Sequence, residues 1–319
     1  MTPGAGWLSA TSAGRLLHCP ASAAFAAAPK AVPASAPDNA GTLAHFAMSA
    51  WLDSRAWLEG EPGRALQAAW DSEAELRKVD AKRLRDSVIT RSRLRSRGAE
   101  LAGLLQAAGQ RARSEVFLQD GVQLLYGQLD IMVDVGDGAV IDLKTGADGH
   151  NESVRTQLLI YAHLFRQETG FLPSALVAFS LTHGSVYFDC SEVAIDELLA
   201  RVEDARKYPS VELPDPSGCG FCRRRLRCES HWRAALAWRD PDCVEGVVSK
   251  VEVAAAGLTA IRVETSQGDH WVTGLSSSIS GAATPGARIR FTEVTSRGEQ
   301  GSKEWRATSS TRSQILYDA

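Results

Sequence analysis

The sequence lacks several features that mark large classes of proteins. No apolar run in the 319-residue chain approaches the roughly 20 residues that a transmembrane helix needs. The first residues lack the basic segment and continuous apolar stretch of a secretory signal, so we expect a cytoplasmic protein. The G-x-x-x-x-G-K-[ST] loop is also missing, which excludes an ATPase of the P-loop type within this chain.

An overall excess of positive charge is absent as well, because the net charge is −3. Locally the balance differs: residues 77–97 hold nine Lys or Arg against two Asp, and residues 223–227 hold four arginines. Basic stretches of this kind are typical of contact with nucleic-acid phosphates. A solvated helix face is the alternative for 77–97.

Cysteines are few, and their spacing indicates metal ligation rather than disulfides. Four of the six could act together, namely Cys19 and the later set Cys219, Cys222 and Cys228 in CGFCRRRLRC. Four thiolates hold either a zinc ion or a [4Fe–4S] cluster, and the spacing alone does not separate the two. The remaining two, Cys190 and Cys243, are expected to be small buried hydrophobic residues.

The chain changes character along its length. Helical patterns dominate to about residue 109, short β-type runs separated by Asp-Gly turns follow to residue 144, and helix and strand patterns then alternate. This order predicts an α/β fold with a central mixed sheet flanked by helices. Five β-type segments after residue 243 predict a small all-β barrel, OB-like or SH3-like. We therefore expect domains at 1–235 and 243–319.

Two aspartates and a lysine stand where a metal-dependent hydrolase needs them. Asp130 follows an alternating strand pattern, and Asp142 and Lys144 are two apart on the next strand. Residues at this spacing project from the same face of a strand, so both side chains would enter one site. Carboxylates bind Mg²⁺ or Mn²⁺, which can activate water, and a lysine can stabilise the developing charge.

In their order these residues resemble the RecB-like branch of the PD-(D/E)XK nuclease superfamily, over about residues 8–232. The segments that carry the resemblance are SAGRLLHCP at 12–20, GTLAH at 41–45, Glu115 in SEVF, YGQLD at 126–130, IDLKTG at 141–146 and QLLIY at 157–161. The resemblance implies a restriction-endonuclease-like central sheet and a metal-dependent deoxyribonuclease, acting on single strands or from DNA ends.

The resemblance also assigns roles to residues. It implies metal ligation by His45, Asp130, Asp142 and the Ile141 carbonyl, and catalysis by Lys144. The resemblance further implies that Gln157, Tyr161 and Glu115 belong to the active site, although a structural salt bridge is an equal alternative for Glu115. Gln157 and Tyr161 are four residues apart and would share one helix face.

One cysteine precedes the nuclease motifs in the sequence and three follow them. This spacing resembles that of the iron–sulfur nucleases, namely the AddB subunit of bacterial helicase–nucleases and the Cas-family exonucleases of CRISPR adaptation. This implies a structural [4Fe–4S] cluster that joins the two ends of the nuclease domain, and a helicase or a CRISPR-adaptation or repair protein as partner. Four arginines between the cysteines are expected to face DNA: Arg223, Arg224, Arg225 and Arg227. The alternative from another functional class is a non-catalytic module that binds DNA ends; a zinc-bearing regulatory protein is a third reading.

Overall fold

The computed structural model describes most of the chain in two compact units, Met1–Ser210 (unit 1) and Val211–Ala319 (unit 2). The described residues are 6–20, 23, 26–29, 37, 39–58, 60–108, 111–146, 152–207, 216–220, 222, 224–238, 241–254, 257–281, 283–296 and 304–316. No helix among them is both long enough and apolar enough to cross a membrane.

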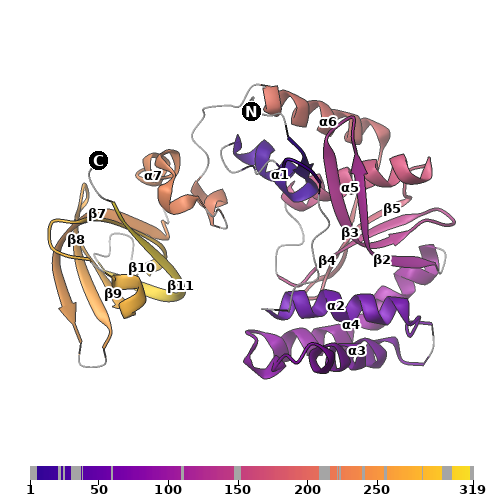
Figure 1. The fold of residues 1–319 in the computed structure, drawn as a ribbon, viewed down its shortest axis with the longest axis horizontal. Coiled ribbons are helices and arrows are strands. Elements are labelled where there is room, and N and C mark those ends of the chain that lie inside the picture. Colours follow the sequence, from indigo (N-terminus) through magenta and orange to yellow (C-terminus); the bar gives the residue numbers. More distant parts are fainter. Residues whose placement is uncertain are drawn as a thin grey trace. The chain divides into compact units, whose positions relative to one another are not determined.

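Unit 1 is built on a mixed six-stranded sheet (Figure 1). Its strands are β1 (Leu8–Ser9), β2 (Ala112–Asp120), β3 (Leu125–Val133), β4 (Ala139–Lys144), β5 (Ala175–Ser180) and β6 (Gly184–Phe188). The order is β1-β3-β4-β5-β6, and β2 pairs with β3. β4 and β5 are parallel because a helix connects them, whereas β2–β3, β3–β4 and β5–β6 are antiparallel neighbours.

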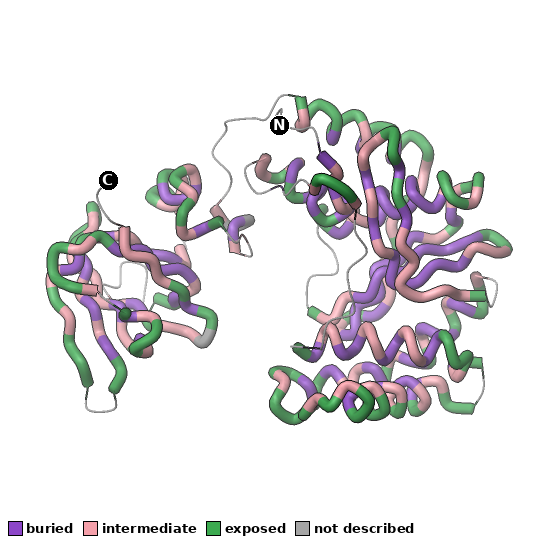
Figure 2. The backbone as a smooth tube through the Cα atoms, viewed as in Figure 1, coloured by how far each residue is buried: buried purple, intermediate pink, exposed green. Residues whose placement is uncertain are grey.

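Helices cover both faces of this sheet. They are α1 (Ala10–His18), α2 (Ala40–Asp53), α3 (Pro62–Leu76), α4 (Ser87–Ala108), α5 (Glu152–Thr169) and α6 (Glu192–Lys207), with the short 3-10 helix η2 (Ala81–Arg83) before α4. One core lies between the sheet and α1, α5 and α6, and the other lies between the sheet and α2, α3 and α4. The central strands β3, β4 and β5 are accordingly buried between the two helical layers (Figure 2), whereas β2 and β6 are mostly half-buried.

Local sequence signals explain most helix ends. Gly170 ends α5 with a φ of 85°, and its N–H donates to the Arg166 carbonyl, which is typical of a glycine C-cap. Ser9 caps α1, because its side chain accepts from the N–H of Ser12, which itself lies inside the helix.

Unit 2 contains the expected all-β element, a closed five-stranded barrel. Its strands are β7 (Cys243–Val253), β8 (Thr259–Thr265), β9 (Gly268–Leu275), β10 (Arg288–Ser296) and β11 (Glu304–Leu316), with α8 (Ser277–Ser280) before β10. The order around the barrel is β10-β11-β9-β8-β7, with β10 also paired to β7. Ten buried hydrophobic residues of the described part fill the interior, Phe291 and Ile289 among them.

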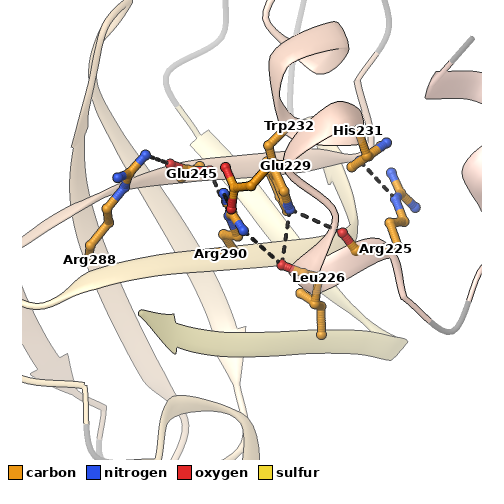
Figure 3. Close-up of polar contacts among 8 residues, drawn as sticks. All are labelled: Arg225, Leu226, Glu229, His231, Trp232, Glu245, Arg288 and Arg290. Atoms are coloured by element: carbon orange, nitrogen blue, oxygen red, sulfur yellow. Dashed lines mark hydrogen bonds and ion pairs between the residues drawn. The ribbon is translucent and has the colours of Figure 1, made fainter. Parts of the chain in front are cut away.

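The segment that bears three cysteines belongs to the same unit as the barrel. It consists of η3 (Pro216–Cys219), η4 (Arg225–Arg227) and α7 (Glu229–Ala235). The expected boundary at 235 therefore differs from the observed one, which falls after Ser210. The physical reason is two buried arginines: Arg225 pairs with Asp242 at the start of the barrel, and Arg290 of β10 pairs with Glu229 of α7 (Figure 3).

Candidate functional site

The candidate site of unit 1 lies where β3 and β4 separate. The two strands pair at Ile131↔Ile141 and toward one end only, so beyond Ile141 the amide of Leu143 has no β3 backbone partner. The Asp130 carboxylate takes that place, since its Oδ2 accepts the Leu143 N–H at 2.6 Å. Asp130 is thus fixed by the sheet itself, with its other oxygen, Oδ1, directed to a neighbouring histidine.

Glu115 lies opposite Asp130 on β2 and adopts an uncommon backbone conformation. Its φ is 50°, in the left-handed region that a residue with a Cβ enters at a cost of roughly 1–2 kcal/mol. Gln128 of β3 holds the side chain, because its Nε2 donates to Oε2 of Glu115 at 2.6 Å. A strained residue that neighbours fix in place is typical of a functional site.

His45 of α2 completes a group that could hold a cation. Its Nδ1 lies 3.3 Å from Asp130 Oδ1 and 3.7 Å from Glu115 Oε1. Ligand atoms of the three residues lie within 4.8 Å of one another. One imidazole nitrogen and two carboxylates are suitable donors for Mg²⁺ or Mn²⁺.

The negative charges of Asp130 and Glu115 favour binding of a cation beside His45. Burial lowers the pKa of His45, but the charges of Asp130 and Glu115 and hydrogen bonds to them outweigh it, so that the pKa lies well above its usual value. The protein without metal therefore holds a proton between these carboxylates. A metal ion would displace that proton, since a histidine binds metal in its neutral form.

Asp142 heads a second group next to the first, on the sheet face that α5 covers. Oδ2 of Asp142 lies 2.7 Å from Lys144 Nζ, and Oδ1 accepts from Gln157 Nε2 at 3.0 Å. The Gln157 Oε1 accepts from Lys144 at 3.0 Å, and its Nε2 also donates to the Tyr161 hydroxyl at 2.8 Å. Aspartate, lysine, glutamine and tyrosine thus form one connected network.

Burial and the neighbouring Asp130 raise the pKa of Asp142 to about 7, although Lys144 acts in the opposite direction. The Asp142 Oδ2 atom is buried and lacks an aligned hydrogen bond among the described residues. The pKa of Tyr161 is also raised well above its usual value, by burial and then by the charges of Asp142 and Asp130. Two carboxylates this close attract a counter-ion more strongly than either would alone.

A glycine allows the tyrosine to reach this network. A Cβ on Gly127 of β3 would lie 2.5 Å from the Tyr161 ring, so the ring packs directly on the strand backbone. A second glycine brings α2 close to the end of β4, because a Cβ on Gly41 would lie 2.8 Å from the Thr145 hydroxyl oxygen. These contacts give the glycines of YGQLD and GTLAH a steric role.

The structure brings together His45, Glu115, Asp130, Asp142, Lys144, Gln157 and Tyr161, all of which the sequence singled out. Asp142, a predicted metal ligand, is oriented toward Lys144 and Gln157 instead of His45. Glu115 occupies the position in the group around His45 that was expected for Asp142. Ile141 lies in the middle of β4 with its side chain in the core shared with α2. Gln128 was missed, although its position two residues before Asp130 on the same strand was a usable signal.

The four predicted cluster ligands divide between the units. Cys19 ends α1 in unit 1, whereas Cys219, Cys222 and Cys228 lie in unit 2. None of the six cysteines forms a disulfide. Cys243 is buried as expected, whereas Cys190 is only half-buried against the core of unit 1, and burial raises the pKa of both thiols to about 11. The four-cysteine cluster stays a prediction.

The arginines among the cysteines have different surroundings. Arg224 and Arg227 are exposed, and Arg223 lies outside the described residues. Arg225 differs from the expected position facing DNA, because its side chain is 3% exposed and makes a forked ion pair with Asp242. Its burial follows from the carboxylate at the start of the barrel, which the spacing of the cysteines does not reveal.

Comparisons with known proteins add little to this geometry. No family model and no curated protein matches the sequence. Solved structures with some similarity include the tetrameric p202 HIN2 (14% identity, TM-score 0.21), of which the chain covers 40% while 24% of this chain is matched. SSO0001 has 16% identity and a TM-score of 0.29, with 63% of this chain and 89% of that one covered. A murine DNA-binding protein bound to double-stranded DNA has 12% identity and a TM-score of 0.23, with 49% and 76% covered.

Proposed function

We propose that unit 1 is a metal-dependent deoxyribonuclease domain of the RecB-like type. The observation that carries the proposal is the convergence of three potential ligands from three elements, His45, Glu115 and Asp130, beside the Asp142–Lys144–Gln157 network. The strand fork, the strained Glu115 and the perturbed pKa of Asp142 all occur at this place. Functional sites are where such features gather.

The residues of the site would have separate roles in metal binding and in charge stabilisation. A bound Mg²⁺ or Mn²⁺ would neutralise charge on the scissile phosphate and lower the pKa of an attacking water. His45, Glu115 and Asp130 would hold the ion, and Asp142 would join them after turning from Lys144. Lys144, positioned by Gln157, would stabilise the charge that develops on the phosphate. Tyr161 fixes the amide of Gln157 and so the direction of both neighbours.

The sheet order of unit 1, with β4 central and Asp142 and Lys144 near its end, supports a restriction-endonuclease-like core. The barrel order and its parallel β9–β11 pair support an OB-like barrel. For cofactors we keep a structural [4Fe–4S] cluster on the four cysteines, with zinc as the alternative. DNA strands or ends are the proposed substrate, and a helicase or a CRISPR-adaptation or repair protein is the proposed partner.

A non-catalytic module that binds DNA ends is the second candidate. Catalysis is favoured over binding alone because Asp130, Asp142 and Lys144 are all present. Asp130 is bonded to the Leu143 amide next to Asp142, and Gln157 links Asp142 to Lys144. The two functions separate in one experiment. Purified protein is incubated with labelled single- and double-stranded DNA and Mn²⁺, beside the Asp142→Ala and Lys144→Ala variants.

Degradation by the wild type and loss of it in both variants would support the nuclease at this site. Equal degradation by all three proteins would place the activity elsewhere. DNA binding without degradation by any of them would favour the binding module. A mobility-shift assay on the same samples separates binding from cleavage.

A further inference from the structure

The three carboxylates of the candidate site share one pattern of contacts. In each, one oxygen accepts a hydrogen bond from an amide, and the other oxygen faces a basic nitrogen. In Asp130, Oδ2 accepts from the Leu143 N–H at 2.6 Å, and Oδ1 lies 3.3 Å from Nδ1 of His45. In Glu115, Oε2 accepts from Gln128 Nε2 at 2.6 Å, and Oε1 lies 3.7 Å from the same His45 nitrogen.

Asp142 repeats the pattern on the neighbouring strand. Its Oδ1 accepts from Gln157 Nε2 at 3.0 Å, and its Oδ2 lies 2.7 Å from Lys144 Nζ. The Asp142 side chain is buried, and Oδ2 lacks an aligned hydrogen bond among the described residues. Each of the three carboxylates therefore has one oxygen held by the protein and one oxygen directed toward a positive group.

The pairing of β2 with β3 explains how Gln128 reaches Glu115. The ladder runs through Ser114↔Ile131 and Val116↔Leu129, so Glu115 lies opposite Asp130 between these pairs. Gln128 and Asp130 are two residues apart on β3 and project from the same face of the strand. The left-handed backbone of Glu115, with a φ of 50°, occurs at this point of the ladder.

The number of oxygens that a carboxylate offers affects which cation it binds. Mg²⁺ requires a nearly ideal octahedron of ligands, and one oxygen from each carboxylate suits that geometry. Ca²⁺ takes about six to eight oxygen ligands and often binds both oxygens of one carboxylate. Both oxygens can bind one ion only when both are directed toward it, and here an amide holds one of them toward the protein.

We propose that this arrangement selects Mg²⁺ or Mn²⁺ over Ca²⁺, and that Gln128 is the residue that determines the selectivity. The inference rests on the metal site of the proposed nuclease, and it adds the choice of ion to that proposal. Among the three amide donors, the Leu143 donor belongs to the backbone, and Gln157 also binds Lys144 and Tyr161. Gln128 is therefore the donor to remove in order to free one carboxylate alone.

The test measures the affinities for Mn²⁺ and for Ca²⁺ by calorimetry in variants of the full chain. Gln128→Met keeps the length of the side chain and removes the amide that binds Glu115. Gln119→Met is the matched control, because Gln119 is an exposed glutamine of β2 in the same strand pair. Glu115→Ala, made with and without Gln128→Met, shows whether Gln128 acts through this carboxylate.

We expect the ratio of Mn²⁺ affinity to Ca²⁺ affinity to fall about tenfold or more in Gln128→Met, since groups that orient metal ligands typically change affinity by about 10–100-fold. Gln119→Met should keep the wild-type ratio. In the Glu115→Ala protein, adding Gln128→Met should leave the ratio unchanged, because the carboxylate that Gln128 holds is gone.

Near-ultraviolet circular dichroism reports whether each variant is folded. If Gln128→Met is not, Gln128→Asn decides, because its amide is one methylene shorter. A wild-type ratio in the folded variant, or an equal fall without Glu115, would overturn the role of Gln128. A wild type that binds Ca²⁺ as tightly as Mn²⁺ would overturn the selectivity and leave the metal site standing. A wild type that binds neither ion would overturn the proposed metal site as well.

Discussion

Replacing Gly127 by alanine tests how the packing of unit 1 supports its candidate site. The added Cβ would lie 2.5 Å and 2.9 Å from two carbons of the Tyr161 ring, and 3.3 Å from a methyl of Leu164. Ordinary carbon contacts are about 3.5–4.0 Å, so the ring must move by roughly 1 Å. Tyr161 is buried against β3 in the main core of this face, so the movement is resisted from all sides.

The expected effects follow from that displacement. Overpacking of a core typically costs about 1–3 kcal/mol in the free energy of unfolding. The 2.8 Å hydrogen bond between Tyr161 and Gln157 would break, which frees the amide that positions Asp142 and Lys144. Misplacement of this order can cost about 10²-fold in rate. We therefore expect cleavage of DNA to fall about 10–100-fold.

Urea unfolding gives the stability, and single-turnover cleavage with Mn²⁺ gives the rate. Gly103→Ala is the matched control, because a Cβ there meets nothing within 4 Å in the middle of α4. Alanine in a helix is favoured over glycine by about 0.5–1 kcal/mol, so the control should be slightly more stable and equally active. Tyr161→Phe should lose rate with little loss of stability. A Gly127→Ala protein as stable as the wild type would refute the packing argument.

Three further outcomes are expected. Since the pKa of Asp142 is raised to about 7, its proton competes with Mn²⁺ in addition to the proton on His45. The Mn²⁺ affinity measured by calorimetry should therefore fall more steeply below about pH 7 in the wild type than in Asp142→Asn. Burial raises the pKa of Asp120, but hydrogen bonds from His163 and from the backbone amides of Val122 and Gln123 outweigh it, so the pKa is lowered. The stability that the ionised Asp120 contributes is present above roughly pH 4 and is lost as the pH falls. The midpoints of urea unfolding should therefore drop more steeply with falling pH in the wild type than in Asp120→Asn. Asp242→Ala leaves Arg225 buried without its carboxylate, and calorimetric or urea unfolding should show a loss of about 3–5 kcal/mol, against about 0–1 for the exposed partner in Asp269→Ala.

The grouping of the candidate site residues could be predicted because strand period and order carry the information. Asp142 and Lys144 lie two apart on one strand, and both reach Gln157 as expected from that spacing. The orientation of Asp142 could not be predicted, because it depends on which cation, Lys144 or a metal, is nearer. The strained backbone of Glu115 was also invisible, since it arises from the way β2 and β3 pair around Asp130.

The domain boundary shows a different limit. Composition placed it after residue 235, where the β-type segments begin, but the cysteine segment packs with the barrel through Arg290 and Arg225. Both arginines look like surface charges in the sequence. Their burial depends on carboxylates far along the chain, such as Glu245 for Arg290, and local patterns do not encode such pairs.

The proposed nuclease function requires that the residues around His45 and Asp142 hold a metal and that Lys144 acts on the substrate beside it. The most direct test measures Mn²⁺ binding and single-turnover cleavage of labelled single-stranded DNA together, for the wild type and Lys144→Met at about pH 8. We expect nearly equal Mn²⁺ affinity and cleavage at least about 10²-fold slower in the variant. Equal cleavage by both proteins, or cleavage by the wild type that continues without any metal, would contradict it.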